Sequence, residues 1–338
     1  MSTNLSDHTT FKVGGPASEF FVAKDEDEAI RLVSEADQKK LPVLILGGGS
    51  NILVADSGFS GRVIKMEMTG DIRAVDSCSG GMITIGAGRD WDDFVDECVR
   101  KGFVGVESLS GIPGTVGAAP IQNIGAYGHD LSEVTARVRT FDRVAKEIVT
   151  FSQSESGYSY RSSRFKENPE RYLILDVTFQ MKQGELSLPI LYPELAEALD
   201  VEEEERAPLG KVREAVLAIR GRKGMVLDPN DPDTNSAGSF FTNPIVAQSQ
   251  VPDGATSWPS GDGRFKISAA WLMENAGISK GMKLANAGIS LKHVLALTNP
   301  GKASASEIKA LADLCTEKVH GKFGIELERE VRLVGFAQ

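Results

Sequence analysis

Apolar and polar residues follow helical spacing in some parts of the chain and strand-like spacing in others. Residues 25–40 place apolar side chains on one side of a helix, from Ala29 to Ala36, which predicts a helix with one buried face. The short apolar run at 42–46 follows and predicts a buried strand. The next predicted elements are strands at 52–54, 62–66 and 82–85 and a helix at 90–101.

The rest of the chain continues this succession of helices and strands. An acidic run from Glu202 to Glu205 is typical of a solvated helix start or a loop. No internal repeat or low-complexity tract interrupts the pattern. The predicted elements are strands within 134–152 and at 172–179, a helix at 208–222, a helix at 268–277, a strand at 293–298, a helix at 305–320 and a closing strand at 325–334.

Length and composition limit the classes of protein that this chain can be. Its 338 residues are enough for about two or three domains of roughly 150 residues or less. No apolar run approaches the roughly 20 residues that a membrane-spanning helix needs. The first residues carry neither a basic start nor an apolar stretch, so we expect a cytoplasmic protein without membrane insertion. A formal charge of −10 argues against nucleic acid as a partner, because phosphate backbones bind clustered Lys and Arg.

Cysteine and histidine positions give no sign of a metal site. Cys78, Cys98 and Cys315 are far apart and odd in number, which predicts reduced thiols and no disulfide framework. None of the four histidines has the spacing of a zinc motif. They are His8, His129, His293 and His320.

Two glycine-rich segments stand out. The loop Gly47-Gly48-Gly49-Ser50-Asn51 joins two strand-like segments, whereas a Rossmann fingerprint needs a helix after the glycines. The loop is either a tight turn or a nest of backbone N–H groups for phosphate oxygens. The second segment, Ser110 to Gly128, is too irregular for one element and too apolar for a solvated linker, which suggests backbone wrapped around a ligand.

In this order, GGGSN between strands and IPGTVGAAPIQNIGAYG resemble the FAD-binding domain of UDP-N-acetylenolpyruvoylglucosamine reductases, which share a fold with vanillyl-alcohol-oxidase-type (PCMH-like) flavoenzymes. The resemblance implies noncovalent FAD, with the pyrophosphate on the first segment and the flavin on the second. The implied cofactor-binding residues are Gly47, Gly48, Gly49, Ser50, Asn51, Pro113, Gly114, Gln122, Asn123 and Gly125.

Further motifs of the same family imply the catalytic residues. Tyr160-Arg161 resembles a Y-R motif whose Arg lies near the flavin and the substrate carboxylate, although a lone Arg is more often a surface residue. NSAGSFFTNP resembles the segment whose Ser, here Ser239, donates a proton. LEREVR resembles the closing motif and implies Glu330 as the catalytic carboxylate.

Periodicity alone leaves the choice between Glu330 and Glu328 open. In the closing segment Ile325, Leu327 and Val331 share one face, so both glutamates lie on the other, solvent-facing side. The remaining implied substrate contacts are Tyr160, Tyr192, Lys223 and Asn243. For Lys223 the alternative is a lysine at a helix end, and the substrate contact is favoured over it.

The resemblance covers most of the chain and implies an α+β fold in three parts. These are FAD-binding subdomains at 1–67 and 68–222 and a C-terminal α+β substrate-binding domain at 223–338. The implied activity is NADPH-dependent reduction of an enolpyruvyl UDP-sugar in peptidoglycan precursor synthesis by a monomer. Ala118 and Ala119 replace serines of some relatives, and His293 replaces a glutamine. A flavin-dependent oxidase of the same fold and a noncatalytic nucleotide-sugar-binding protein are the alternatives.

Overall fold

A computed structural model describes residues 3–76 and 80–337. The described chain divides into two compact units, and each is discontinuous in sequence. The first unit contains residues 17–48 and 60–221, and the second contains 3–16, 49–59 and the chain from Arg222 onward. The three-part division expected from the sequence, at 1–67, 68–222 and 223–338, stays a prediction.

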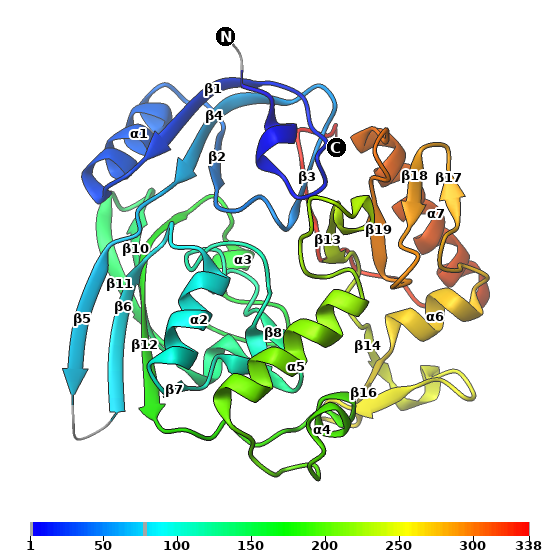
Figure 1. Cartoon of the computed structure of the whole chain (residues 1–338). Helices are drawn as coiled ribbons and strands as arrows, with labels where there is room; N and C mark the ends of the chain where they lie inside the picture. Colours follow the sequence, from blue (N-terminus) through cyan, green and yellow to red (C-terminus); the bar gives the residue numbers. More distant parts are fainter. Residues whose placement is uncertain (1–2, 77–79, 338) are drawn as a thin grey trace. The chain divides into compact units, whose positions relative to one another are not determined.

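The first unit contains a small sheet, in which β2 and β4 run parallel, and a larger antiparallel one (Figure 1). The strand order is β1-β4-β2 in the small sheet and β11-β10-β12-β6-β5 in the larger, with β7 also paired to β12. The strands are β1 (Ala17–Ala23), β2 (Val43–Leu46), β4 (Phe59–Met66), β5 (Asp71–Asp76), β6 (Gly80–Gly86), β7 (Phe103–Val104), β10 (Thr135–Asp142), β11 (Glu147–Ser152) and β12 (Tyr172–Gln183), with β8 (Gly125–Ala126) and β9 (His129–Asp130) as a short hairpin.

Helices of the first unit bury one face against these sheets. α1 (Glu26–Gln38) begins at Asp25, whose side chain accepts a hydrogen bond from the Glu28 N–H, and it buries Leu32 and Val33. α2 (Trp91–Arg100) packs Phe94 against Phe179 of β12, with ring centroids 4.9 Å apart. The other helical segments are η2 (Glu107–Leu109), η3 (Leu131–Glu133), α3 (Arg164–Glu167), α4 (Pro193–Leu199) and α5 (Leu209–Arg222).

The second unit is a mixed structure around its own core. Its sheets have the orders β13-β19-β18-β17 and β14-β16-β15, and β20 pairs in parallel with β3. α7 begins with a capping box between Ser304 and Glu307 and ends at Gly324, which has a φ of +65°. The elements are η1 (Leu5–His8), β3 (Ile52–Val54), η4 (Pro232–Thr234), β13 (Ser236–Ser239), β14 (Ile245–Ala247), η5 (Gln248–Gln250), β15 (Ser257–Pro259), β16 (Arg264–Ile267), α6 (Ala269–Asn275), β17 (Lys283–Leu284), β18 (Ala287–Ile289), β19 (Ala296–Thr298), α7 (Ala305–Phe323) and β20 (Arg332–Val334).

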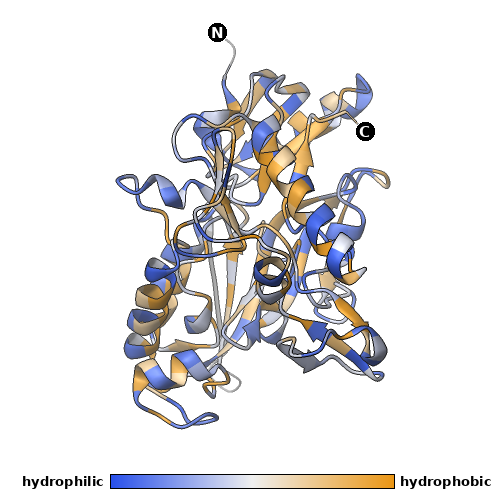
Figure 2. Ribbon diagram, turned by 90° about the vertical axis from the view of Figure 1, so that its right-hand side faces the viewer, coloured by the Kyte–Doolittle hydropathy of each residue, from blue (hydrophilic) through white to orange (hydrophobic). Residues whose placement is uncertain are grey.

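Hydropathy follows these elements as the periodic pattern predicted. Hydrophilic and hydrophobic residues alternate along the helices in Figure 2, as they do in amphipathic helices. The buried residues of α1, including Ala29 and Ala36, are those that the helical spacing selected. The acidic run at 202–205 is exposed and precedes α5 as a loop.

The predicted strand at 325–334 is wrong in its extent. Only 332–334 form a strand, because β20 pairs with the short β3, while the preceding residues meet a single bridge between Arg329 and Phe241. The period-two burial still holds, since Ile325, Leu327 and Val331 are buried. Buried and exposed side chains therefore alternate here although the backbone does not form a continuous ladder of hydrogen bonds.

Candidate active site

The first halves of the two glycine-rich segments pack against each other in the first unit. A Cβ atom placed on Gly47 would lie 2.5 Å from Thr115 Oγ1, and one on Gly48 would lie 2.8 Å from the Gly114 Cα. The Gly114 carbonyl accepts the N–H of Trp91 at 3.1 Å, which ties the second segment to the start of α2. The two segments that the resemblance assigns to FAD thus approach each other closely because Gly47 and Gly48 carry no side chains, and such glycines also allow close approach by a large cofactor.

The second half of the first loop belongs to the second unit. Gly49 has a φ of +63°, and a Cβ there would overlap the carbonyl oxygen of His8. The Asn51 amide donates to the Glu330 carbonyl at 3.1 Å, and the Asn51 carbonyl accepts the Arg332 N–H at 3.1 Å. The loop that was predicted to bind pyrophosphate therefore also holds the backbone around Glu330.

The side chain of Asn123 makes two hydrogen bonds within the protein. Asn123 is 2% exposed and has a φ of +46°. Its amide donates to the Ser159 carbonyl at 3.2 Å, and its Oδ1 accepts the Ser132 N–H at 3.0 Å. Both ends of the amide therefore bond within the protein, and the contact of Asn123 with the cofactor stays a prediction.

Arg161 lies against the second glycine-rich segment. Its guanidinium donates to the Gly125 carbonyl at 2.5 Å and to the Asn123 carbonyl at 3.4 Å. Arg161 has a φ of +52°, in a turn where Ser159 and Ser162 exchange backbone hydrogen bonds. The exposed Tyr160 ring lies 5.6 Å from the guanidinium carbon. The structure thus places this predicted catalytic residue on the predicted flavin segment.

His129 joins this segment to the chain that leads to Tyr192. Its ring is buried and makes two hydrogen bonds of 2.9 Å, from Nδ1 to the Glu133 carboxylate and from Nε2 to the Pro189 carbonyl. Burial disfavours the imidazolium, but these two acceptors outweigh it and raise the pKa of His129. Tyr192 itself is 40% exposed and packs edge to face on Tyr127, with ring centroids 5.4 Å apart.

Ser239 lies at a β-bulge in the second unit. Ser236 pairs with Thr298 and Ser239 with Ala296, so β13 contains one residue more than β19 between these pairs. Gly238 supplies the bulge with a φ of +70°, a conformation that L residues rarely adopt. Because a bulge redirects side chains along a strand, it sets the direction of the half-buried Ser239 hydroxyl.

Glu330 lies beside the residue that follows Ser239. The Glu330 N–H donates to the Phe240 carbonyl at 2.9 Å, while the Glu328 carbonyl accepts the Thr242 N–H at 3.0 Å, two residues further from Ser239. Glu330 is half-buried and Glu328 is exposed. The structure thus brings Glu330 closer to Ser239 along the paired backbones than its rival.

The predicted substrate contacts of the second unit lie at element ends. Asn243 accepts the first N–H of α6 from Ala269 at 2.9 Å, and Lys223 directly follows α5. An ion pair between Lys292 and Asp231 fixes the loop that follows Lys223 and raises the pKa of Lys292. These contacts position the loops, and the roles of Asn243 and Lys223 in substrate binding stay predictions.

Two charged residues, Arg220 and Asp92, escaped the sequence analysis. Burial lowers the pKa of Arg220, the positive charge of Arg161 adds to this, and Tyr127 and Asp92 oppose it. Asp92 accepts two hydrogen bonds from Arg213, at 2.6 and 2.9 Å, and the Gly111 N–H at 2.6 Å. Arg220 precedes Lys223 by three residues, and this helical spacing could have pointed to Arg220 from the sequence. Nothing in the sequence links Asp92 to Gly111.

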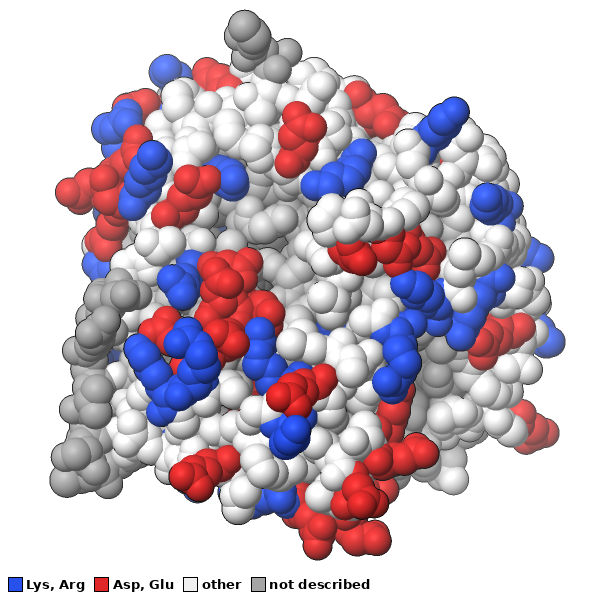
Figure 3. All heavy atoms as spheres, in the orientation of Figure 1, with Lys and Arg blue, Asp and Glu red and all other residues white. Residues whose placement is uncertain are grey.

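Charges elsewhere are mixed. Lys and Arg are interspersed with Asp and Glu on the face shown in Figure 3. Among the described residues, no cluster of three or more His, Cys, Asp or Glu is arranged to hold a metal ion. Within the same residues, no helix combines the length and apolarity needed to cross a membrane. Cys98 and Cys315 are buried free thiols, and Cys78 lies outside the described residues.

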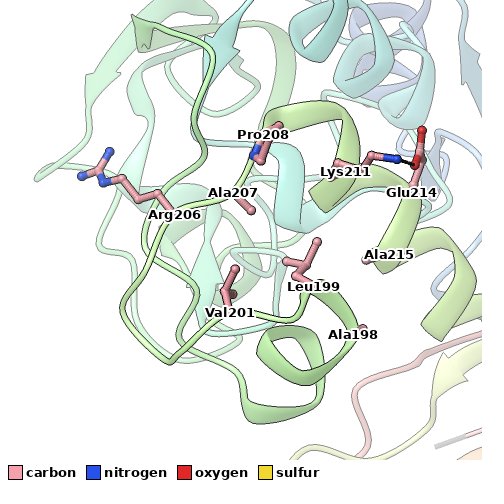
Figure 4. Close-up of a pocket in the computed structure, with 9 residues that line it drawn as sticks. All are labelled: Ala198, Leu199, Val201, Arg206, Ala207, Pro208, Lys211, Glu214 and Ala215. Carbon is pink, nitrogen blue, oxygen red and sulfur yellow. Dashed lines mark hydrogen bonds and ion pairs between the residues drawn. The ribbon is translucent and has the colours of Figure 1, made fainter.

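A separate pocket of about 370 Å³ lies between α4 and α5 (Figure 4). Arg206 extends away from the other labelled side chains, and Lys211 pairs with Glu214 at 3.1 Å. Its lining includes none of the predicted site residues, so it adds nothing to the candidate active site. The lining residues are Ala198, Leu199, Val201, Arg206, Ala207, Pro208, Lys211, Glu214 and Ala215.

Comparisons with known proteins agree with the predicted fold. A model of the C-terminal domain of UDP-N-acetylenolpyruvoylglucosamine reductase matches residues 229–334, and a model of an FAD-binding domain matches residues 17–148. These matches confirm the predicted FAD-binding fold followed by a C-terminal α+β domain.

Whole-chain relatives carry the same name. UDP-N-acetylenolpyruvoylglucosamine reductase from Cutibacterium acnes is 51% identical, with 98% of this chain and 89% of the relative covered. The one from Thermobifida fusca is 46% identical, with 98% and 96% covered. A crystal structure of the reductase from Thermus caldophilus is similar, with a TM-score of 0.68 at 26% identity, 99% of this chain and 98% of that chain being covered.

Proposed function

Because the chain belongs to the UDP-N-acetylenolpyruvoylglucosamine reductase family, we propose that it reduces the enolpyruvyl ether of that UDP-sugar in peptidoglycan precursor synthesis. The observation that carries the proposal is 51% identity over almost the whole chain. The product would be UDP-N-acetylmuramate. We propose that the protein acts in the cytoplasm as a monomer.

FAD fits the two glycine-rich segments. Gly47 and Gly48 lie so close to Gly114 and Thr115 that larger residues would not fit there. Because these positions carry no side chains, the backbone groups of the loop are open to the cofactor. The residues proposed to hold FAD noncovalently are those of the loop Gly47 to Asn51 together with Pro113, Gly114, Gln122, Asn123 and Gly125. When bound, FAD supplies the transfer of hydride from NADPH to the substrate.

The protein would supply charge stabilisation and a proton. Hydride addition to the terminal carbon of the enolpyruvyl group moves negative charge toward the neighbouring carbon and the carboxylate. Arg161 offers planar donors for that carboxylate, and Glu330 is the proposed acidic partner in the site. Ser239 would then protonate the neighbouring carbon, which completes the addition of one hydride and one proton.

The geometry supports Glu330 over Glu328 for this role. The Glu330 N–H bonds to the residue after Ser239, and its side chain is less exposed than that of Glu328. Tyr160, Tyr192, Lys223 and Asn243 are the proposed substrate contacts, with Lys223 suited to a diphosphate. Their loops are held by neighbouring backbone and ring contacts.

A visible absorption spectrum tests the proposal. The purified protein should show a flavin band that NADPH bleaches under anaerobic conditions and that the enolpyruvyl UDP-sugar restores. Absence of flavin after reconstitution would refute the function, and rapid restoration by oxygen without response to the UDP-sugar would indicate an oxidase.

Substitution of Ser239 tests the proton donor. Ser239→Ala should leave bleaching by NADPH nearly unchanged and slow the restoration by substrate by about 10²-fold or more, the usual contribution of a general acid. Ser260→Ala, which changes an exposed serine of the same unit, should affect neither step. Equal losses in both steps with Ser239→Ala would rule out the role.

A further inference from the structure

The N-terminal segment 3–16 is an integral part of the second unit. The Leu5 N–H donates to the Gly15 carbonyl at 3.0 Å, and the Gly15 N–H donates to the Ala55 carbonyl at 2.9 Å. The segment therefore folds back on itself and is fastened to the chain that follows the first glycine loop. Thr10 lies within it at 7% exposure.

Thr10 makes hydrogen bonds to two functional elements. Its hydroxyl donates to the Ser236 carbonyl at 2.6 Å, across 226 residues of sequence. Its N–H donates to the Gly49 carbonyl at 3.2 Å. One buried residue thus connects the first residue of β13 to the loop proposed to bind the FAD pyrophosphate.

The contact with Ser236 lies just before the bulge that directs Ser239. After the bulge, the Phe240 N–H donates to the Leu295 carbonyl at 2.8 Å, which holds that end of the segment. At Gly238, a Cβ atom would meet no described atom within 4 Å, so packing around that position does not hold the bulge. Within the bulge, the Gly238 N–H donates to the Ser236 hydroxyl oxygen at 3.2 Å. The geometry of the bulge therefore depends on how Ser236 is held, and Ser236 is held by its pairing with Thr298 and by the hydrogen bond from Thr10.

We infer that Thr10 is a positioning residue that aligns the Ser239 hydroxyl by holding the start of the bulged strand against the glycine loop. The inference rests on the proposed function, in which Ser239 donates the proton. Alignment matters because a proton donor acts only within hydrogen-bond reach, and a displacement of about 1 Å can cost about 10²-fold in rate.

Thr10→Val tests the inference because it keeps the shape of the side chain and removes the hydroxyl. Thr10→Ser keeps the hydroxyl and should rescue the effect. Thr9→Val is the matched control, since the buried Thr9 hydroxyl donates to the Val13 carbonyl at 3.0 Å, within the same segment. Ser239→Ala is measured alongside to test the proposed function separately.

The expected result is a selective defect in Thr10→Val. Restoration of the flavin band by the enolpyruvyl UDP-sugar should slow by about tenfold, with a larger solvent deuterium isotope effect, because protonation becomes more rate-limiting. Reduction by NADPH and the FAD dissociation constant should stay within about twofold. Amide hydrogen exchange in the peptide 236–241 should speed up relative to the Thr9→Val control.

Other outcomes overturn the inference in distinguishable ways. If Ser239→Ala is impaired but Thr10→Val matches Thr9→Val, the positioning role is wrong and the proton donor stands. If Ser239→Ala is not impaired, the proposed function fails first. If Thr10→Val does not fold, Thr10→Ala removes the same hydroxyl without the added methyl. Failure of both beside a folded Thr9→Val would mean that Thr10 serves folding and not alignment.

Discussion

Replacement of Asn123 should destabilise the flavin segment by an amount that the structure allows us to work out. Asn123→Ala removes the hydrogen bonds to Ser159 and from Ser132, at about 1 kcal/mol each. It also places an alanine at a φ of +46°, which costs about 1 kcal/mol more. The free energy of unfolding should therefore fall by about 3 kcal/mol, the sum of these three contributions, since the side chain that is removed is itself buried.

Asn123→Asp separates these contributions. The carboxylate keeps the acceptor for the Ser132 N–H and tolerates positive φ, but it loses the donor to the Ser159 carbonyl, so we expect a loss of about 1–2 kcal/mol. Because Ser159 anchors the turn that carries Arg161, this variant should also slow substrate reduction.

Urea unfolding with linear extrapolation measures both variants, and Asn168→Ala serves as the control because Asn168 is exposed and should change stability by less than about 0.5 kcal/mol. An Asn123→Ala protein within about 0.5 kcal/mol of the wild type would refute the argument. Equal losses in the Ala and Asp variants would refute the part assigned to backbone conformation.

Three further outcomes follow from the contacts of the first unit. Asp92→Ala should lower the free energy of unfolding by about 2 kcal/mol in urea titrations, because it removes the acceptor for Arg213 and for the Gly111 N–H; an unchanged midpoint would contradict this. Because the pKa of His129 is raised in the folded protein, its contribution to stability is fully present below the ordinary imidazole pKa of 6.5 and is lost as the pH rises through the higher folded pKa. His129→Gln should therefore flatten the decline in melting temperature above pH 6.5. A His129→Gln protein whose melting temperature depends on pH as in the wild type would argue against this contribution of His129. Burial raises the pKa of Cys98 and raises the pKa of Cys315 to about 12. Peptide mapping should therefore find both thiols unalkylated by iodoacetamide at pH 8 until urea is added. Rapid labelling of the folded protein would count against the burial of these thiols.

Local patterns were sufficient for much of the fold. The helix at 26–38 and the strand at 43–46 lie within two residues of the predicted ranges, because helical spacing and a short apolar run each report which side chains must be buried. Strands at 17–23 and 71–76 were missed. The motifs around Gly47, Ser239 and Glu330 identified the family by their residue order, and identity to relatives confirms that assignment.

The contacts that organise the site could not be read from the chain, because they join residues far apart in sequence. The motif places Asn123 in the predicted flavin segment but gives no sign that its amide bonds to Ser159 and Ser132. Glu328 and Glu330 are equivalent by period-two spacing; the closing motif favours Glu330, and the pairing of this segment with 240–242 supports that choice. Thr10 meets Ser236 across 226 residues. Periodicity reports whether a side chain is buried, whereas the partner of each polar group is decided by which backbones the tertiary structure brings within hydrogen-bond distance.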